Sequence, residues 1–339
     1  MYKFRNDYSE MAHPNILNAL IKYSNEQNDT YGLDKHSKNA EKQIKKLFDL
    51  KKSAVYFVSG GTQANMLVIS YFLKPYEGVI ACDTGHINVH ETAAVESSGH
   101  KIYTVKNKDG KVTPEEVLRA LKINNNEHMV KLKMVYISNS TEIGTIYSKK
   151  ELEELYKVCK ENDLFLFIDG ARLSSALTSK ENDLKCNELA NLCDVFYIGG
   201  TKNGLLSGEA IILNNVKDKN EFRYHIKNKG AMLAKGFVLG IQFEEIFKND
   251  LYFKLGSYAN HLADIIKDSL KDHNIEMLDS PTNQIFVKAD NKLKELLIGK
   301  YDCELWEELD DYTIVRIVTS WATKVSSVNK LIEDIGLLF

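Results

Sequence analysis

The chain has 339 residues, of which 44% are apolar and 27% are charged, a balance typical of a folded globular protein and unlike that of a disordered or fibrous one. Its 44 Lys and Arg against 47 Asp and Glu leave a formal net charge of −3, and no basic run could follow a phosphate backbone, so we expect no nucleic-acid partner. The N-terminus lacks the apolar core of a secretory signal, and no apolar run approaches the roughly 20 residues that span a bilayer. We therefore expect a cytoplasmic protein that does not enter a membrane.

The cysteines argue against dithiol or zinc chemistry. They are five in number, widely scattered, and include no Cys-x-x-Cys pair. We expect reduced, mostly buried thiols at all five positions: Cys82, Cys159, Cys186, Cys193 and Cys303.

From about residue 53 to residue 213, short β-branched and aromatic runs alternate with amphipathic stretches. The predicted strands are SAVYFVS, GVIACD, KIYTV, MVYIS, LFLFID, VFYIGG and EAIIL. Two helices are predicted to begin at capping boxes, with Thr113 and Ser148 as caps and a glutamate three residues after each. The pattern indicates an α/β domain whose mostly parallel seven-stranded sheet is sandwiched by helices.

The C-terminal third follows a different pattern. Residues 217–272 are predicted to form almost continuous helix that leads away from the large domain. EML, NQIFVKA and TIVRIVTS then read as strands and VNKLIEDIGLLF as a closing helix, which together predict a small α+β domain. We accordingly divide the chain into a large domain at residues 1–235, which includes the N-terminal segment, and a small domain at residues 236–339.

One glycine-rich loop, at residues 59–65 (SGGTQAN), lies between a predicted strand and a predicted helix. Glycines let backbone amides turn toward a ligand and a helix N-terminus adds positive potential, so this loop could hold a phosphate. It is neither G-x-G-x-x-G nor G-x-x-x-x-G-K-[ST], which argues against a dinucleotide or a nucleoside triphosphate. By itself it could equally be a plain strand-to-helix turn.

Two charged residues have positions that suggest chemistry. Asp169 ends the apolar strand LFLFID, where ligands of open α/β sheets bind, and Arg172 could be its ion-pair partner. Lys202 lies in a glycine-flanked turn, where a partly desolvated amine would be reactive. Alone, these could be a structural ion pair and a solvated loop lysine. Together with the glycine loop they supply what pyridoxal phosphate requires: a phosphate site, a carboxylate for the pyridine nitrogen and a lysine for a Schiff base.

Several segments now support a family resemblance from Phe4 to about Thr323. In chain order they are FRNDYSEMAHP, TYGLD, SGGTQAN, GHINVHETAA, NSTEIGT, FIDGARL, GGTKNG and VRIVTSWAT. They resemble the threonine aldolase and β-eliminating lyase family of fold-type I pyridoxal-phosphate enzymes, most of all its low-specificity L-threonine aldolases. The resemblance implies that fold, pyridoxal 5′-phosphate as cofactor, and aldol cleavage of L-threonine or L-allo-threonine to glycine and an aldehyde.

The resemblance also assigns roles to the cofactor-binding residues. It implies that Lys202 forms the Schiff base and that Asp169 pairs with the pyridine nitrogen. It makes Gly61 and Thr62 part of the phosphate site. Arg172, in the D-G-A-R motif, would lie beside the cofactor phenolate and the substrate carboxylate.

On the substrate side, the resemblance implies that Arg316 clamps the α-carboxylate, a task suited to a bidentate guanidinium. It implies that His86 stacks on the cofactor ring and that His128 lies near the substrate; either histidine, or an ordered water, could accept the β-hydroxyl proton. His86 and His90 stand four residues apart and could form a metal pair on a helix, but no further ligand has zincin spacing, so we expect no metal.

Two further matches concern assembly. Lys235 resembles a basic residue that reaches a neighbouring subunit's phosphate, and Tyr31 resembles a residue contributed across the same interface, so a homotetramer, or at least a homodimer, with shared active sites is implied. Asn6 stands where many members have a serine near the substrate carboxylate, and Asn139 where many have a glutamate. These departures concern the substrate preference and not cofactor binding.

Other functions are compatible with the same residues. A β-eliminating lyase or an aminotransferase acting on another amino acid would use the same cofactor. A catalytically silent binding protein could keep the fold, and a metal hydrolase using His86 and His90 is a distant third. Motif spacing does not distinguish threonine from allo-threonine, because that choice depends on sub-ångström placement of the hydroxyl group.

Overall fold

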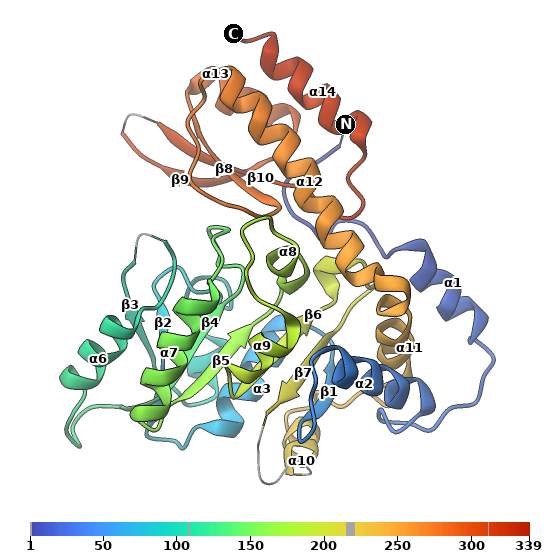
Figure 1. Cartoon of the computed structure of the whole chain (residues 1–339), viewed down its shortest axis with the longest axis vertical. Coiled ribbons are helices and arrows are strands. Elements are labelled where there is room, and N and C mark those ends of the chain that lie inside the picture. The colour runs from blue at the N-terminus through green and yellow to red at the C-terminus, as the bar shows by residue number, and fades with distance from the viewer. Residues whose placement is uncertain (1, 108, 215–220, 311) are drawn as a thin grey trace.

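The computed structural model describes residues 2–107, 109–214, 221–310 and 312–339. A large sheet with helices on both faces forms the lower part of the molecule in Figure 1, and a small antiparallel sheet with its own helices forms the upper part. The long helix α12 runs beside both parts, and both chain ends lie near the small sheet (Figure 1). The mostly parallel α/β sheet predicted from the sequence is confirmed.

The large sheet has the strand order β1-β7-β6-β5-β4-β2-β3. Strands β2 to β6 run parallel, whereas β7 is antiparallel to both of its neighbours, β6 and β1. All seven strands lie where the sequence predicts them: β1 Ala54–Val58, β2 Glu77–Cys82, β3 Ile102–Val105, β4 Lys131–Ser138, β5 Phe165–Asp169, β6 Val195–Gly199 and β7 Glu209–Leu213.

Helices cover this sheet, and two of them begin at the predicted capping boxes. Thr113 caps α6 and Ser148 caps α7, each with the reciprocal glutamate bond to the cap amide. The helical elements of this part are α1 Pro14–Lys22, α2 Lys35–Leu47, α3 Gly61–Phe72, α4 His86–Val89, α5 Ala94–Ser97, α6 Pro114–Ile123, α7 Lys149–Glu161, α8 Leu173–Leu177, α9 Cys186–Asn191, η1 Thr201–Asn203, α10 Glu221–Asn228 and α11 Phe237–Ile246.

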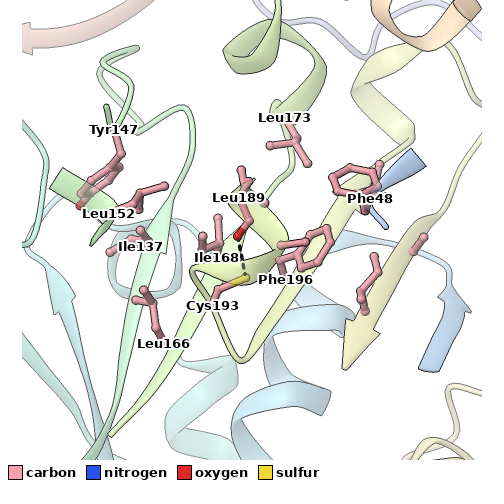
Figure 2. Packing of buried hydrophobic residues seen from close by; sticks show 14 of the residues in the cluster. Phe48, Ile137, Tyr147, Leu152, Leu166, Ile168, Leu173, Leu189, Cys193 and Phe196 are labelled. Carbon is pink, nitrogen blue, oxygen red and sulfur yellow. Dashed lines mark hydrogen bonds between the residues drawn. The ribbon is translucent and has the colours of Figure 1, made fainter. Parts of the chain in front are cut away.

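The two faces of the sheet carry separate apolar cores, because successive strand side chains point to opposite faces. Ile168 and Phe196 face α7, α9 and α11, whereas Phe167 and Tyr197 face α3 and α10. Figure 2 shows part of the first core, in which the Cys193 thiol donates a hydrogen bond to the Leu189 carbonyl at 3.5 Å. All five cysteines are free and only Cys186 is more than slightly exposed, which confirms the prediction of buried thiols.

The C-terminal part contains a small antiparallel sheet with the order β8-β10-β9. Leu262, Val287 and Val315 belong to the apolar core between this sheet and its helices. Its elements are η2 Lys248–Asp250, α12 Leu251–Asp272, β8 Gln284–Ala289, α13 Asn291–Lys294, η3 Glu295–Lys300, β9 Glu304–Glu308, β10 Thr313–Val318 and α14 Val325–Gly336.

Two predictions for this part need correction, and one strand was missed. The predicted helix at 217–272 is interrupted after α10, where Gly230 has a φ of +71°, and again between α11 and α12, where Asn249 and Asp250 have positive φ; residues 217–220 lie outside the described residues. The segment EML forms only an isolated bridge from Met277 to Val287. Strand β9 was not predicted, because its exposed, glutamate-rich sequence lacks the apolar content of a strand.

The N-terminal segment connects the two parts. Phe4 is fully buried in the core of the small sheet, and the Phe4 amide donates to the Tyr301 carbonyl at 2.9 Å while Val318 donates to the Phe4 carbonyl at 2.8 Å. The chain then reaches the large sheet at Asp7. The division at residue 235 stays a prediction. Within the described ranges, no helix has both the length and the apolar content needed to cross a bilayer.

Candidate active site

A buried carboxylate marks the carboxyl edge of the large sheet. Asp169 is the last residue of β5 and is 3% exposed. Its Oδ1 accepts hydrogen bonds from the Tyr197 hydroxyl at 2.5 Å and the Ala171 amide at 3.0 Å, and its Oδ2 accepts from the Tyr136 hydroxyl at 2.6 Å and the Asn65 amide at 3.1 Å. The parallel strands β4 and β6 thus present both tyrosines on the face that Asp169 occupies.

These contacts keep Asp169 ionised. Burial by itself raises the pKa of a carboxyl group, but the neighbouring His86 and the hydrogen bonds from Tyr136 and Tyr197 outweigh it, so the pKa of Asp169 lies below its usual value. A buried anion with this support can hold a cationic ligand group without being neutralised first.

His86 is oriented by acidic residues on both sides. Its Nδ1 lies 2.8 Å from Oε1 of buried Glu91, and its backbone amide donates to Glu142 at 2.9 Å. The Asn65 amide bridges Glu91, at 2.7 Å, to Asp169. Burial raises the pKa of the Glu142 carboxyl, and the nearby charge of Asp169 adds to this effect. The Glu91 contact points Nε2 of His86 away from Glu91, and within the described residues Nε2 makes no hydrogen bond.

Lys202 lies in the short helix η1, immediately after β6. Burial and the nearby charge of Arg172 lower the pKa of its amine, against the opposing influence of Asp7, Asp169 and Glu209. Its Nζ lies 5.9 Å from the centre of the Tyr8 ring. The structure therefore places a partly desolvated amine beside the carboxylate at the end of the neighbouring strand, as the sequence predicts.

A second buried carboxylate holds the turn that carries Lys202. Glu209 Oε2 accepts from the Gly200 amide at 2.8 Å, and Oε1 accepts from the Thr201 hydroxyl at 2.8 Å. Burial raises the pKa of Glu209 to about 7, although both hydrogen bonds and the charge of Lys202 oppose the shift. Sequence reasoning missed this residue, since it reads as an ordinary strand glutamate.

The glycine loop forms the start of α3, as predicted. Gly60 is the N-cap and has no side chain to bind the first-turn amides, and Gly61 and Thr62 are the first helical residues. A Cβ atom at Gly61 would lie 3.0 Å from the Tyr197 hydroxyl, so a larger residue would crowd the Asp169 cluster. Free amides at the N-terminus of this twelve-residue helix are suited to an anion.

Arg172 forms a buried ion pair with a residue of the N-terminal segment. Its Nε and Nη2 donate to the two carboxylate oxygens of Asp7 at 2.7 and 3.0 Å. Asp7 is 2% exposed and also accepts from the Asn283 amide at 3.0 Å. The partner that the sequence suggested, Asp169, is not the one that Arg172 binds, because Asp7 of the N-terminal segment lies against its guanidinium.

Arg316 lies on the central strand of the small sheet, 9% exposed. Its Nη2 pairs with Glu304 and its Nη1 donates to Gln284 at 3.2 Å. Its guanidinium lies 4.9 Å from the centre of the Trp306 ring. Burial and the charge of Arg172 lower the pKa of Arg316, against the opposing charges of Glu304 and Asp7.

His128 lies apart from this cluster. His128 is exposed in the loop before β4, whereas the site is at the other end of that strand, about 25 Å away for eight residues of extended chain. Within a single chain, His128 therefore does not reach Asp169 and Lys202.

Asn6 precedes Asp7, and its side-chain oxygen accepts a hydrogen bond from the Tyr8 amide at 2.9 Å, which places it near the Arg172 pair.

Tyr31 and Lys235 lie together, but on the outer surface. The Tyr31 amide donates to the Ala234 carbonyl at 3.0 Å, next to exposed Lys235. The Tyr31 side chain is 39% exposed and lies 4.7 Å from Lys227 Nζ. The structure thus brings together the two residues that the family resemblance places at a subunit interface.

His86 and His90 lie close to each other. Their rings are 5.4 Å apart, but no group of three or more potential metal-binding side chains occurs among the described residues.

Sequence reasoning missed the residues that orient the site rather than those that define its chemistry. Tyr136 and Tyr197 were the available signal: each carries a hydroxyl in an otherwise apolar strand, with the side-chain parity of Asp169.

The residues present fit pyridoxal phosphate. Uncapped amides at the start of α3 suit its phosphate, ionised Asp169 suits a protonated pyridine nitrogen, and the desolvated amine of Lys202 suits its aldehyde. Gly61 also lets the start of α3 approach the Tyr197 hydroxyl, since a Cβ at this position would lie only 3.0 Å from it.

Comparisons with known proteins agree with this geometry. The β-eliminating lyase family model matches residues 4–300. A low specificity L-threonine aldolase from Pseudomonas sp. (strain NCIMB 10558) is 30% identical over 347 residues, covering 98% of this chain and 96% of that protein. The solved structure of Leishmania major threonine aldolase is 44% identical with a TM-score of 0.98, covering 100% of this chain and 99% of that one. The histidinol-phosphate aminotransferase from Clostridium acetobutylicum, 14% identical with a TM-score of 0.74 over 100% of this chain and 99% of that one, shares the fold.

Proposed function

Because this chain belongs to the β-eliminating lyase family, we propose that it is a pyridoxal-phosphate-dependent aldehyde lyase that cleaves L-threonine and L-allo-threonine to glycine and acetaldehyde. The observation that carries the proposal is that buried Asp169, held by four hydrogen bonds, and the amine of Lys202 lie at the carboxyl ends of the neighbouring strands β5 and β6. The threonine aldolase relatives, which match along almost the whole chain, support the choice of substrate.

The cofactor, when bound, withdraws electrons from the substrate bond that breaks. The amides of Gly61 and Thr62 would hold its phosphate at the N-terminus of α3, where the helix dipole favours an anion. Asp169 would keep the ring nitrogen protonated, and its four hydrogen bonds fix it in place for this role. Lys202 would attach the cofactor through an amine that burial helps to deprotonate.

On the substrate side, Arg316 would bind the α-carboxylate and thereby set which bond at Cα lies across the cofactor ring. Arg172 adds positive charge beside it, although two of its donor groups are committed to Asp7. His86 would accept the β-hydroxyl proton at Nε2, because its Nδ1 is held by Glu91. We leave His128 out of this mechanism, since it lies at the opposite edge of the sheet.

The test is a visible spectrum of the purified protein, followed by L-threonine addition with alcohol dehydrogenase and NADH to report acetaldehyde. The wild type and a control variant at an exposed lysine, Lys254→Ala, should show a cofactor band and oxidise NADH, whereas Lys202→Ala should do neither. An unchanged spectrum in Lys202→Ala would contradict the lysine assignment.

Parallel assays on the same protein, for keto acid, for ammonia and with a chelator, separate the other candidate functions. Keto acid or ammonia formed without aldehyde would indicate a β-eliminating lyase or an aminotransferase. Bound cofactor without turnover of any amino acid would indicate a silent binding protein. Loss of activity on chelation would indicate a metal hydrolase.

We propose further that the protein is a homotetramer, or at least a homodimer, with active sites completed across the interface by Tyr31 and Lys235. The support is a surface hollow of about 660 Å³ lined by Tyr31 together with Leu33, 50% exposed, and Tyr224, 76% exposed. Such grouped apolar side chains are typical of an interface. Analytical ultracentrifugation should show a multimer for the wild type and its dissociation in Tyr224→Glu; a monomeric wild type would refute the proposal.

We also propose a cytoplasmic location, which the five free cysteines support.

A further inference from the structure

The inner face of the small sheet is built around Arg316. In an antiparallel sheet, directly opposed residues share a face, and Arg316 on β10 is opposite Phe286 on β8 and Glu304 on β9. A register shift between Ile314 and Val315 leaves Trp306 as an additional residue of β9. The other face packs into the apolar core, so this polar face is the one turned to the large sheet.

Contacts with the large part confirm this orientation. The Trp306 ring lies 6.2 Å from the ring of His90, which follows α4 and is 5.4 Å from the ring of His86. Trp306 also packs edge-on against Phe286 at 5.1 Å. The strand that the sequence did not predict, β9, therefore contributes directly to the wall of the candidate site.

Glu304 is the carboxylate that Arg316 binds in this structure. It pairs with Nη2 of Arg316, and within the described residues this is its one side-chain hydrogen bond. Its side chain is 32% exposed, whereas the Arg316 side chain is 11% exposed. Glu304 can thus leave toward solvent while Arg316 stays in place.

Arg172, the other arginine of the site, has a partner carboxylate that is buried and held in place. Asp7, which pairs with Arg172, is 2% exposed and is held by Asn283 as well. Releasing Asp7 would leave a buried carboxylate without its cation, whereas releasing Glu304 exposes a carboxylate that water can solvate. Of the two ion pairs, only the one at Arg316 is arranged for exchange.

We propose that Glu304 is a displaceable internal carboxylate that occupies Arg316 in the unliganded protein and that the α-carboxylate of the amino-acid substrate replaces it. The inference rests on the proposed function for the identity of the substrate. Glu304 therefore sets the substrate affinity: a substrate must compete with it for Arg316, and molecules without a carboxylate cannot displace it. Trp306, against the guanidinium plane, and Gln284, at 3.2 Å from Nη1, keep Arg316 oriented during the exchange.

The test compares Glu304→Gln with a matched control, Glu307→Gln, which removes the same charge from the same strand. The Glu307 side chain is exposed and makes no hydrogen bond or ion pair among the described residues. Glu304→Gln should lower KM for L-threonine three- to tenfold, with the change in KM rather than in kcat, and Glu307→Gln should change neither. In an Arg316→Gln background, Glu304→Gln should no longer lower KM.

Calorimetric titration of the holoenzyme with glycine gives a second readout that needs no turnover. Glu304→Gln should bind glycine three- to tenfold more tightly than the wild type and Glu307→Gln. Equal affinities, or weaker binding by Glu304→Gln, would overturn the inference and would instead mean that Glu304 is needed to position Arg316. If the wild type binds glycine but forms no aldehyde, the proposed function fails while the comparison of affinities still decides the role of Glu304. If none of the proteins binds glycine, both proposals fail.

Discussion

Replacing Asp7 with alanine would leave the Arg172 guanidinium buried without its counter-ion. Two hydrogen bonds, at 2.7 and 3.0 Å, join the pair, and the two side chains are 2% and 11% exposed. At about 4 Å between charge centres and an effective dielectric constant near 20, the attraction is about 4 kcal/mol. Because removal of one partner also leaves the other charge unpaired, we expect Asp7→Ala to lower the free energy of unfolding by about 3–5 kcal/mol.

The loss should depend on pH in a defined direction. Burial raises the pKa of Asp7, but the charges of Arg172 and Lys202 outweigh it, so this pKa is lower in the folded protein than its usual 3.8. A carboxyl group of this kind stabilises the fold above its unfolded pKa, and the stabilisation is lost as the pH falls through its folded pKa. The difference between wild type and Asp7→Ala should therefore be full at neutral pH and should shrink below about pH 4.

Urea unfolding followed by circular dichroism, at fixed protein and cofactor concentrations, measures this difference. Asp302→Ala is the control, because it removes a carboxylate whose partners, Lys3 and Arg5, are largely exposed, and we expect a much smaller loss. In the double variant Asp7→Ala/Arg172→Met, the loss should be less than the sum of the single losses. A loss below about 1 kcal/mol for Asp7→Ala, or strictly additive effects, would refute the assignment of a coupled buried pair.

Asp169→Asn should reduce turnover by about 10²-fold or more while the far-ultraviolet spectrum stays that of the wild type, because the shape is kept and the negative charge is lost. Tyr197→Phe removes a 2.5 Å hydrogen bond to Asp169, so it should reduce turnover less and raise the pH below which activity declines; an unchanged pH profile would speak against this. Glu209→Gln should flatten the fall in stability between about pH 5 and 7, since the pKa of Glu209, near 7, exceeds its unfolded value and wild-type stability falls as pH rises through that window. If both proteins lose stability equally there, Glu209 is not the group responsible.

Much of the large sheet could be predicted from the sequence because its signals are local. The apolar runs of the buried strands are periodic and bounded by turns, and the caps at Thr113 and Ser148 act within one helical turn. Asp169 and Lys202 could be proposed as site residues because a charge at or just after the end of an apolar strand stands out. The end of such a strand also fixes the edge of the sheet at which the residue lies.

The remaining features depend on contacts between distant segments. Arg172 was given a partner three residues away, but its partner in the structure, Asp7, is 165 residues distant. The position of His128 near the substrate stays a prediction: within one chain it precedes β4, whereas the site follows β4. The partner of Arg172 was mispredicted because sequence order gives the succession of elements and not the side chain that a folded neighbour presents.

The sequence by itself determined which elements form and which groups can react, because strand pattern, helix caps and the chemistry of Asp169 and Lys202 are properties of short segments. Only the tertiary structure decided which carboxylate binds each arginine. Asp7 reaches Arg172 because the N-terminal segment passes from the small sheet to the large one, and Glu304 reaches Arg316 because of the register of β9 against β10. Both pairings follow from long-range packing, which no local pattern records.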